Sequence, residues 1–171
     1  MPSEPLRKAP GSRWRYSKTG PDMADHNHPY LQTIRSYYEG CSTANFDQIR
    51  TTFTDDVVHY FTHAPAIHGG DNLASFWVKV GKRFEDQFAV DHGIVDGNEC
   101  VIEWTLEFTP TEGAARELIR GAEWYVFRGG LIAEIRAYYL NRHDPYPRTN
   151  FELWDYPYGA RGYYQLGDVK R

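Results

Sequence analysis

The feature that most constrains the fold is a pair of strand-like segments within residues 115–140, separated by Arg128-Gly129-Gly130. In the second segment every other residue from 131 to 139 is apolar, and the residues between them after Ile132 are polar or amphipathic. This alternation predicts a β-hairpin with one buried face and one polar face. The first segment carries an acidic residue, Glu123, among apolar neighbours. The face that Glu123 occupies therefore decides what chemistry the chain can perform.

The length of the connecting loop sets the position of Glu123 through the register of the hairpin. A two-residue Gly129-Gly130 turn would pair Glu123 with Arg136 on the polar face. A three-residue loop from Arg128 to Gly130, with Gly130 at positive φ, would pair Glu123 with Ile135 on the buried face; both loop lengths are common. A buried carboxyl group costs several kcal/mol unless it is partnered or protonated. A buried Glu123 would therefore be a candidate functional residue.

The composition is that of a globular domain and argues against several classes of protein. The 171 residues are most consistent with a single domain, with a net charge of −4 and no long basic run that would favour nucleic acid. No apolar stretch is long enough to span a membrane, and the first residues lack the apolar core of a signal peptide. Two cysteines without a CxxC pair fit a reducing cytoplasm. No phosphate-binding loop or complete set of metal ligands is present, so we expect neither a cofactor nor a metal ion.

The chain divides into three parts by pattern. Residues 1–26 carry Pro, Gly, Ser and basic residues with little periodicity, and we expect a flexible N-terminal arm. Residues 27–140 contain helical periodicity first and strand alternation afterwards, which predicts one α+β domain. Residues 141–171 are rich in aromatic side chains, and we expect this tail to pack on the domain or on a partner subunit.

Three groups of residues resemble the nuclear transport factor 2-like superfamily, in its SnoaL-like and ketosteroid-isomerase-like branch. They are Phe53-Thr54-Asp55-Asp56-Val57-Val58, Ile67-His68-Gly69-Gly70, and Phe127-Arg128-Gly129-Gly130-Leu131-Ile132 leading to Arg136-Ala137-Tyr138-Tyr139. The resemblance covers roughly residues 29–140. It implies a cone-shaped fold in which a curved antiparallel sheet wraps around three N-terminal helices and leaves a cavity for a hydrophobic small molecule. It also implies the longer loop in the central hairpin, and so an inward-facing Glu123.

The ketosteroid isomerase pattern carries over to this chain in part. The resemblance places the tyrosine of the oxyanion hole on Tyr37 and its carboxylic acid on Glu123. The general-base aspartate would fall near Phe61, where this chain has no carboxylate. The aspartate of the epoxide-hydrolase branch would fall on Ala137.

Two other positions are candidates for moving a proton. With a tight turn at Asp96-Gly97, His92 and Glu103 share a sheet face, either as an acid/base pair or as a structural hydrogen bond. Asp91 would then face the opposite way. His59 is the alternative base, in place of the missing aspartate. Residues expected to line the cavity are Phe61, Trp77, Tyr125, Ile135 and Tyr139, although Trp77 also fits a core or interface role.

Together with these residues, the resemblance implies a cofactor-independent isomerase, cyclase or dehydratase that acts on an apolar oxygenated molecule, such as a polyketide- or terpenoid-like carbonyl compound. His92, with His59, would transfer the proton and Glu103 would orient the histidine. Tyr37 and a neutral Glu123 would stabilise the enolate oxygen. The alternative is a small-molecule-binding or dimerisation scaffold without catalysis.

The polar face of the central hairpin also predicts an assembly. On this face we expect Trp124, Val126 and Ile132 beside several charged residues. A mixed apolar and polar sheet face is typical of an interface, and the resembled family often dimerises through it. We therefore expect a homodimer.

Overall fold

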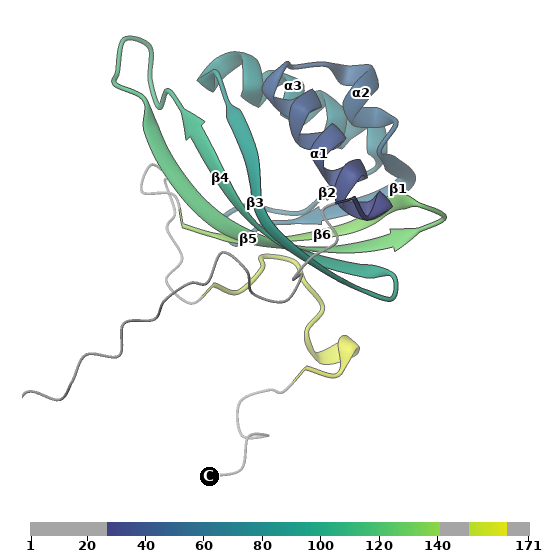
Figure 1. Ribbon diagram of the computed structural model, residues 1–171. Coiled ribbons are helices and arrows are strands. Elements are labelled where there is room, and N and C mark those ends of the chain that lie inside the picture. The colour runs from purple at the N-terminus through teal and green to yellow at the C-terminus, as the bar shows by residue number, and fades with distance from the viewer. Residues whose placement is uncertain (1–26, 141–150, 164–171) are drawn as a thin grey trace, which may run out of the picture.

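A curved sheet with helices packed against its concave face forms the domain (Figure 1). The computed structural model describes residues 27–140 and 151–163. The elements in chain order are α1 (Pro29–Ser42), α2 (Phe46–Arg50), β1 (Phe53–Tyr60), β2 (Ile67–His68), α3 (Gly70–Phe84), β3 (Gln87–Asp96), β4 (Glu99–Phe108), β5 (Glu117–Arg128), β6 (Leu131–Tyr139) and a 3₁₀ turn η1 (Gly159–Arg161). The predicted α+β class and cone-shaped fold are confirmed. None of the described helices has the length and apolar composition required to cross a bilayer.

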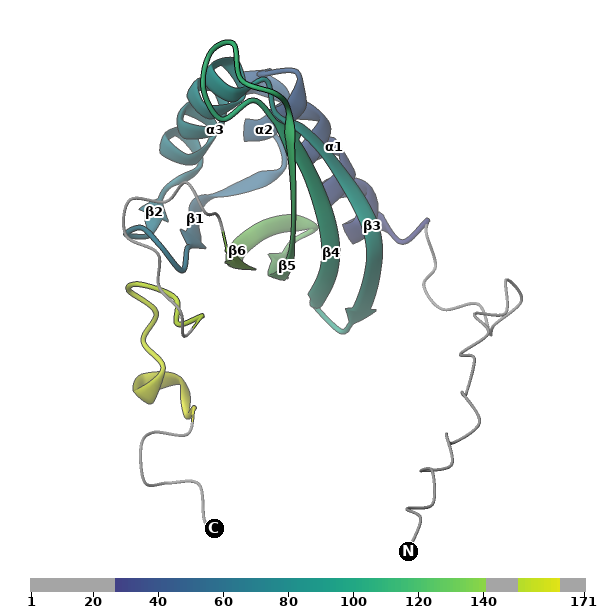
Figure 2. The ribbon, with the colours of Figure 1, turned by 90° about the vertical axis from the view of Figure 1, so that its left-hand side faces the viewer.

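The strand order in the sheet is β2-β1-β6-β5-β4-β3. Strands β1 and β6 run parallel, and every other neighbouring pair is antiparallel. The side view shows the sheet curling around the helices (Figure 2). This curvature leaves room for a cavity between α3 and the long strands β3 to β6.

Local sequence features account for three of the helix ends. Pro29 occupies the first turn of α1, and the His28 ring accepts a hydrogen bond from the backbone N–H of Tyr30. Asn45 caps α2 by accepting from the backbone N–H of Gln48. Helix α3 ends at Glu85, whose φ of 54° is left-handed. This sharp ending places the next residue, Asp86, at the wall of the cavity.

The central hairpin differs from both registers expected from the sequence. The connection is the two-residue turn Gly129-Gly130, with φ values of 62° and 83° that suit glycine. A bulge in β6 then leaves Ala133 unpaired, because Phe127 pairs with Ile132 whereas Val126 pairs with Glu134. Glu123 consequently lies opposite Ala137 on the buried face. The expected three-residue loop is wrong, and the bulge turns Glu123 inward instead.

A second bulge corrects the expected orientation of His92. Val90 pairs with Trp104, whereas His92 pairs with Glu103, so Asp91 is the extra residue in β3. Beyond the bulge the inward position is Gly93, where an added Cβ would lie 2.5 Å from Cδ2 of Leu31. His92 and Glu103 are neighbours as expected, but both are exposed on the convex face.

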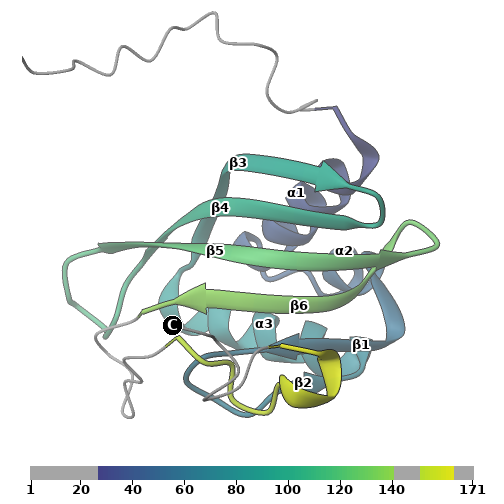
Figure 3. The same cartoon turned by 90° about the horizontal axis from the view of Figure 1, so that it is seen from below.

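The C-terminal segment 151–163 packs against the convex face of the sheet beside β1 and β6 (Figure 3). Leu153 and Tyr156 form a small apolar cluster with Tyr60. The backbone N–H of Trp154 donates to the carbonyl of Phe61 at 2.7 Å. The expected arm, 1–26, and the rest of the tail, 141–150 and 164–171, lie outside the described residues.

Candidate active site

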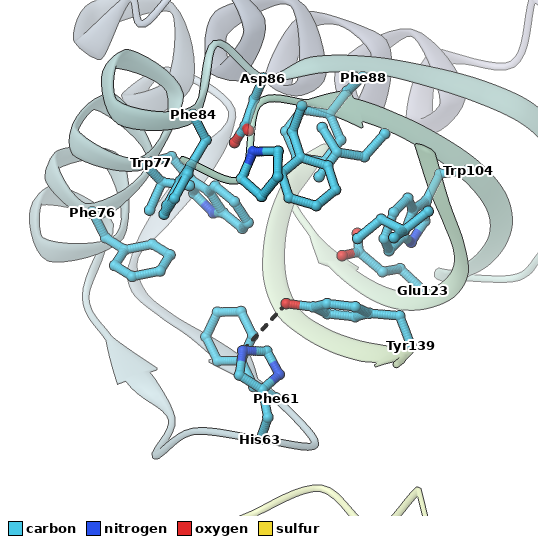
Figure 4. Close-up of a pocket in the computed structure, with 15 residues that line it drawn as sticks. Phe61, His63, Phe76, Trp77, Phe84, Asp86, Phe88, Trp104, Glu123 and Tyr139 are labelled. Atoms are coloured by element: carbon cyan, nitrogen blue, oxygen red, sulfur yellow. Dashed lines mark hydrogen bonds between the residues drawn. The ribbon is translucent and has the colours of Figure 1, made fainter. Parts of the chain in front are cut away.

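A cavity of about 280 Å³ lies between α3 and the concave face of β3 to β6 (Figure 4). Most of its wall is aromatic, contributed by Phe61, Phe76, Trp77, Phe84, Phe88 and Trp104. Two carboxyl side chains, Asp86 and Glu123, also line it, and none of the described lining residues is lysine or arginine. The cavity therefore combines an apolar wall with acidic groups.

Glu123 projects from β5 into this cavity and is only 4% exposed. Its Oε2 accepts a hydrogen bond from the hydroxyl of Tyr38 at 2.8 Å and another from the hydroxyl of Tyr125. The pKa of Glu123 is raised from its ordinary 4.5 to about 7. Burial causes the rise, and the hydrogen bonds from the two tyrosine hydroxyls partly oppose it. The carboxyl group therefore exchanges its proton near neutral pH.

The tyrosine that binds Glu123 is Tyr38, one residue beyond the expected Tyr37. Tyr37 is buried against the rings of Phe53 and Trp77. Consecutive helical residues point about 100° apart, so only one of the pair reaches the carboxyl group. Tyr38 belongs to the same helical stripe as Leu31 and Ile34, which was the available signal in the sequence.

His59 lies behind the wall of the cavity. Its ring stacks on Phe61 at a centroid distance of 4.0 Å, and its Nε2 lies 3.9 Å from Oε1 of Glu123. Neither ring nitrogen has a hydrogen-bond partner among the described residues. Burial, with a smaller effect of His63, lowers the pKa of His59 to about 3, so the ring is neutral. Across residues 27–140 and 151–163, no three His, Cys, Asp or Glu side chains converge as metal ligands would.

The expected pair of His92 and Glu103 is remote from the cavity. Both side chains are exposed on the convex face, and the neighbouring Asp91 accepts a hydrogen bond from Thr105 at 2.6 Å. The bulge at Asp91 is the physical reason, since it reverses the alternation of β3.

Asp86 is a cavity residue that the sequence analysis missed. It is 2% exposed, and its Oδ2 has no hydrogen-bond partner among the described residues. Burial raises the pKa of Asp86 from 3.8 to about 7, and the positive charge of Arg116 acts weakly in the other direction. The signal in the sequence was an acidic residue between Phe84, the last residue of α3, and the start of β3.

Three of the five expected wall residues line the cavity, namely Phe61, Trp77 and Tyr139. The other two are fully buried elsewhere: Tyr125 supports Glu123, and Ile135 belongs to the core. The hydroxyl of Tyr139 lies 3.3 Å from Nε2 of His63, which also faces the cavity (Figure 4).

Residues 34–135 match the family model of the SnoaL-like domain. The chain belongs to the SnoaL-like family. A crystal structure of a protein of unknown function with a cystatin-like fold from Methylobium petroleophilum PM1 is 30% identical, covers 84% of this SnoaL-like chain and 95% of its own, and has a TM-score of 0.70. No curated protein matches the chain.

More distant structures share the fold of this SnoaL-like chain. A protein named a putative polyketide cyclase from Xanthomonas campestris is 20% identical over 65% of this chain and 90% of its own, with a TM-score of 0.57. An epoxide hydrolase from M. tuberculosis is 18% identical over 68% of this chain and 85% of its own, with a TM-score of 0.59. The fold is therefore one that carries enzymes of more than one reaction type.

Proposed function

We propose that the protein is a cofactor-independent acid/base enzyme in which Glu123 moves a proton of an apolar, oxygenated small molecule. The observation that carries this proposal is the buried carboxyl group of Glu123, which faces an aromatic cavity and has a pKa of about 7. A general base or acid works best when its pKa lies near the working pH. Isomerisation, cyclisation and dehydration of carbonyl compounds share a first step that such a group can perform, the removal of a proton beside the carbonyl.

The contacts of Glu123 suit this role. Tyr38 and Tyr125 both donate to Oε2, which fixes the orientation of the carboxylate and leaves Oε1 as the proton acceptor. The cavity wall includes Trp77 and Trp104, whose buried indole N–H groups have no described acceptor. An indole N–H can donate to an oxygen on which negative charge develops. In this proposal Glu123 replaces the histidine as the proton-transferring group.

A substrate-independent test is exchange of acidic C–H protons with solvent. We expect the wild-type protein to accelerate deuterium uptake from D₂O by members of a panel of cyclic ketones and 1,3-diketones, measured by mass spectrometry. Glu123→Gln should lower the rate by about 10²-fold or more, because an amide cannot accept the proton. The matched control is Glu103→Gln, which removes an exposed carboxylate from the neighbouring strand and should leave the rate unchanged.

Equal exchange rates in the wild type and in folded Glu123→Gln would contradict the proposal. Absence of exchange across the panel, together with ligand binding, would favour the non-catalytic binding scaffold. One structural feature favours this second candidate. Near Phe61, where the ketosteroid isomerase pattern has its general-base aspartate, this chain has His59, which is neutral and lies behind the Phe61 ring.

We also propose a homodimer that forms through the uncovered part of the convex face. Residues 151–163 lie beside β1 and β6, whereas Ile94 and Trp124 on β3 and β5 are 56% and 38% exposed. Ile132, expected on this face, is buried because the bulge at Ala133 places it inside. Sedimentation at tens of micromolar protein should show a dimer. Trp124→Glu should shift it to monomer, and a monomeric wild type would contradict the assembly.

The proposed location is the cytoplasm. Cys41 and Cys100 are both buried and unpaired, as in proteins that work under reducing conditions.

A further inference from the structure

The end of the cavity that holds Asp86 has an acceptor without a described donor. Asp86 follows α3 directly, and Figure 4 shows its carboxyl group pointing into the cavity between Phe84 and Phe88. Its Oδ2 is buried and has no hydrogen-bond partner in the described part of the chain. A buried carboxyl oxygen without a donor is costly, and a ligand that supplies an N–H or O–H group removes that cost.

Arg116, the cationic side chain whose charge acts on Asp86, is engaged elsewhere. Arg116 donates to the carboxylate of Glu107 at 2.5 Å and to the backbone carbonyls of Glu85 and Glu107 at 3.2 and 3.1 Å. It does not line the cavity. No described side chain donates to Oδ2 of Asp86, so this oxygen is open to a donor from a ligand.

The charge of the cavity selects the kind of donor. Its titratable lining groups are the carboxyl groups of Asp86 and Glu123, the imidazole of His63 and the hydroxyl of Tyr139, and the described lining residues contain no lysine or arginine. An anionic ligand would meet repulsion from Asp86 and Glu123, whereas a cation would be attracted by both. The fully buried ends of these side chains make the effect stronger than it would be in water.

The aromatic wall of the cavity also favours a cationic ligand. The rings of Trp77, Phe84 and Phe88 lie at the same end of the cavity as Asp86 in Figure 4, and Trp77 and Phe88 pack edge to face at a centroid distance of 5.7 Å. Aromatic faces attract ammonium groups, and the attraction is stronger where water is excluded. A carboxylate within an aromatic enclosure is therefore suited to a protonated amine.

We propose that this cavity binds a compact organic amine in its protonated form, with the ammonium group donating to Oδ2 of Asp86 and the apolar body lying among the aromatic rings toward Glu123. The proposal deepens the proposed function by giving the substrate class of the same site: a carbonyl compound that also carries a basic nitrogen. Burial raises the pKa of Asp86 to about 7, and an ammonium group bound beside it would lower that pKa again by stabilising the ionised carboxylate. The cavity volume of about 280 Å³ limits the ligand to a small ring system.

Binding of three matched probes tests the proposal without any assay of catalysis. The probes are 1-naphthylmethylamine, 1-naphthylmethanol and 1-naphthoic acid, which share a ring system and differ in the charge of one group. Affinities can be followed at neutral pH by quenching of tryptophan fluorescence, since Trp77 and Trp104 line the cavity, and by calorimetry. We expect the amine to bind most tightly, at least about tenfold better than the alcohol, and the acid most weakly.

The Asp86→Asn variant should lose this preference for the amine while retaining its affinity for the alcohol. Asp86→Leu, which suits the apolar surroundings, serves as a second variant if the first does not fold. Asp91→Asn is the matched control, because it removes an exposed aspartate from the convex face and should preserve the preference. Circular dichroism and thermal unfolding establish that each variant is folded.

Three results would overturn the proposal. They are equal binding of the amine and the alcohol to the wild type, no binding of the amine up to its solubility limit, and a preference that survives in both Asp86 variants but is lost in Glu123→Gln. The last result would place the cation at the other carboxyl group. Failure of the deuterium exchange test leaves these binding results unchanged, so the two proposals can fail separately.

Discussion

The concave and convex faces of the sheet both carry glutamate and histidine side chains, which are buried on the concave face and exposed on the convex face. Glu123 on β5 and Glu103 on β4 lie on neighbouring strands, where Glu103 pairs with Ala122. Glu123 is 4% exposed, bound by two tyrosine hydroxyls and has a pKa raised to about 7, whereas Glu103 is exposed to solvent. The comparison teaches that the face of the sheet, more than the residue type, decides whether a carboxyl group is buried at the cavity or exposed to solvent.

The histidines show the same contrast. His59 is fully buried beside Phe61, and burial lowers its pKa to about 3. His92 is exposed on the convex face. Each of the two histidines therefore lacks one requirement of a catalytic base: His59 has a pKa far below neutrality, and His92 has no access to the cavity.

The largest difference between the two faces is expected in the free energy of unfolding when a valine is introduced on each face. At Gly121 a Cβ would lie 2.5 Å from the ring of Trp104 and 2.8 Å from Cβ of Tyr139, both of which line the cavity. Gly121→Val should lower the free energy of unfolding by about 3 kcal/mol through overpacking. Ala122→Val, one residue along the strand and on the other face, should change it by less than about 0.5 kcal/mol. Urea unfolding checks both values, and equal losses would contradict the contrast.

A smaller effect is expected in the pH dependence of stability. The pKa of Glu123 is about 7 in the folded protein and has its ordinary value of 4.5 in the unfolded chain, so the folded protein binds more protons between these values. The stabilisation is present below the unfolded pKa and is lost as the pH rises through the folded pKa. From about pH 5 to about pH 8 this loss is on the order of 2 kcal/mol.

Glu123→Gln has no such proton to lose, so its free energy of unfolding should fall less than that of the wild type over the same range. Asp86→Asn should behave in the same way, because burial also raises the pKa of Asp86 to about 7. Identical pH profiles for wild type and Glu123→Gln would show that Glu123 ionises normally.

The smallest effects are expected on the convex face. His92→Ala and Glu103→Gln remove two exposed side chains that pair across β3 and β4. Each should change the free energy of unfolding by no more than about 0.5 kcal/mol and leave deuterium exchange unchanged. A large loss of activity in either variant would show that the residue belongs to the active site and would contradict its placement on the convex face.

The sequence alone determined the architecture. Helical periodicity early in the domain, strand alternation in the later segments and the turn glycines are local patterns, and they predicted the α+β class. The resemblance of three short motifs predicted the family. The sequence also indicated that Glu123 was the acidic residue to follow. These features follow from periodicity and turn chemistry, which depend on near neighbours in the chain.

Only the tertiary structure decided which side chains meet. The bulge at Ala133 turned Glu123 inward although the loop has two residues, and the bulge at Asp91 turned His92 outward. A bulge changes the alternation by one residue and leaves little trace in composition, so the period-two pattern could not place either side chain. Asp86 and Tyr38 acquired their positions in the same way, from the end of α3 and the rotation of α1 against the sheet. The helical stripe that includes Leu31 and Ile34 marks the buried face on which Tyr38 lies, but the contact of Tyr38 with Glu123 depends on packing between distant segments, which the order of residues does not display.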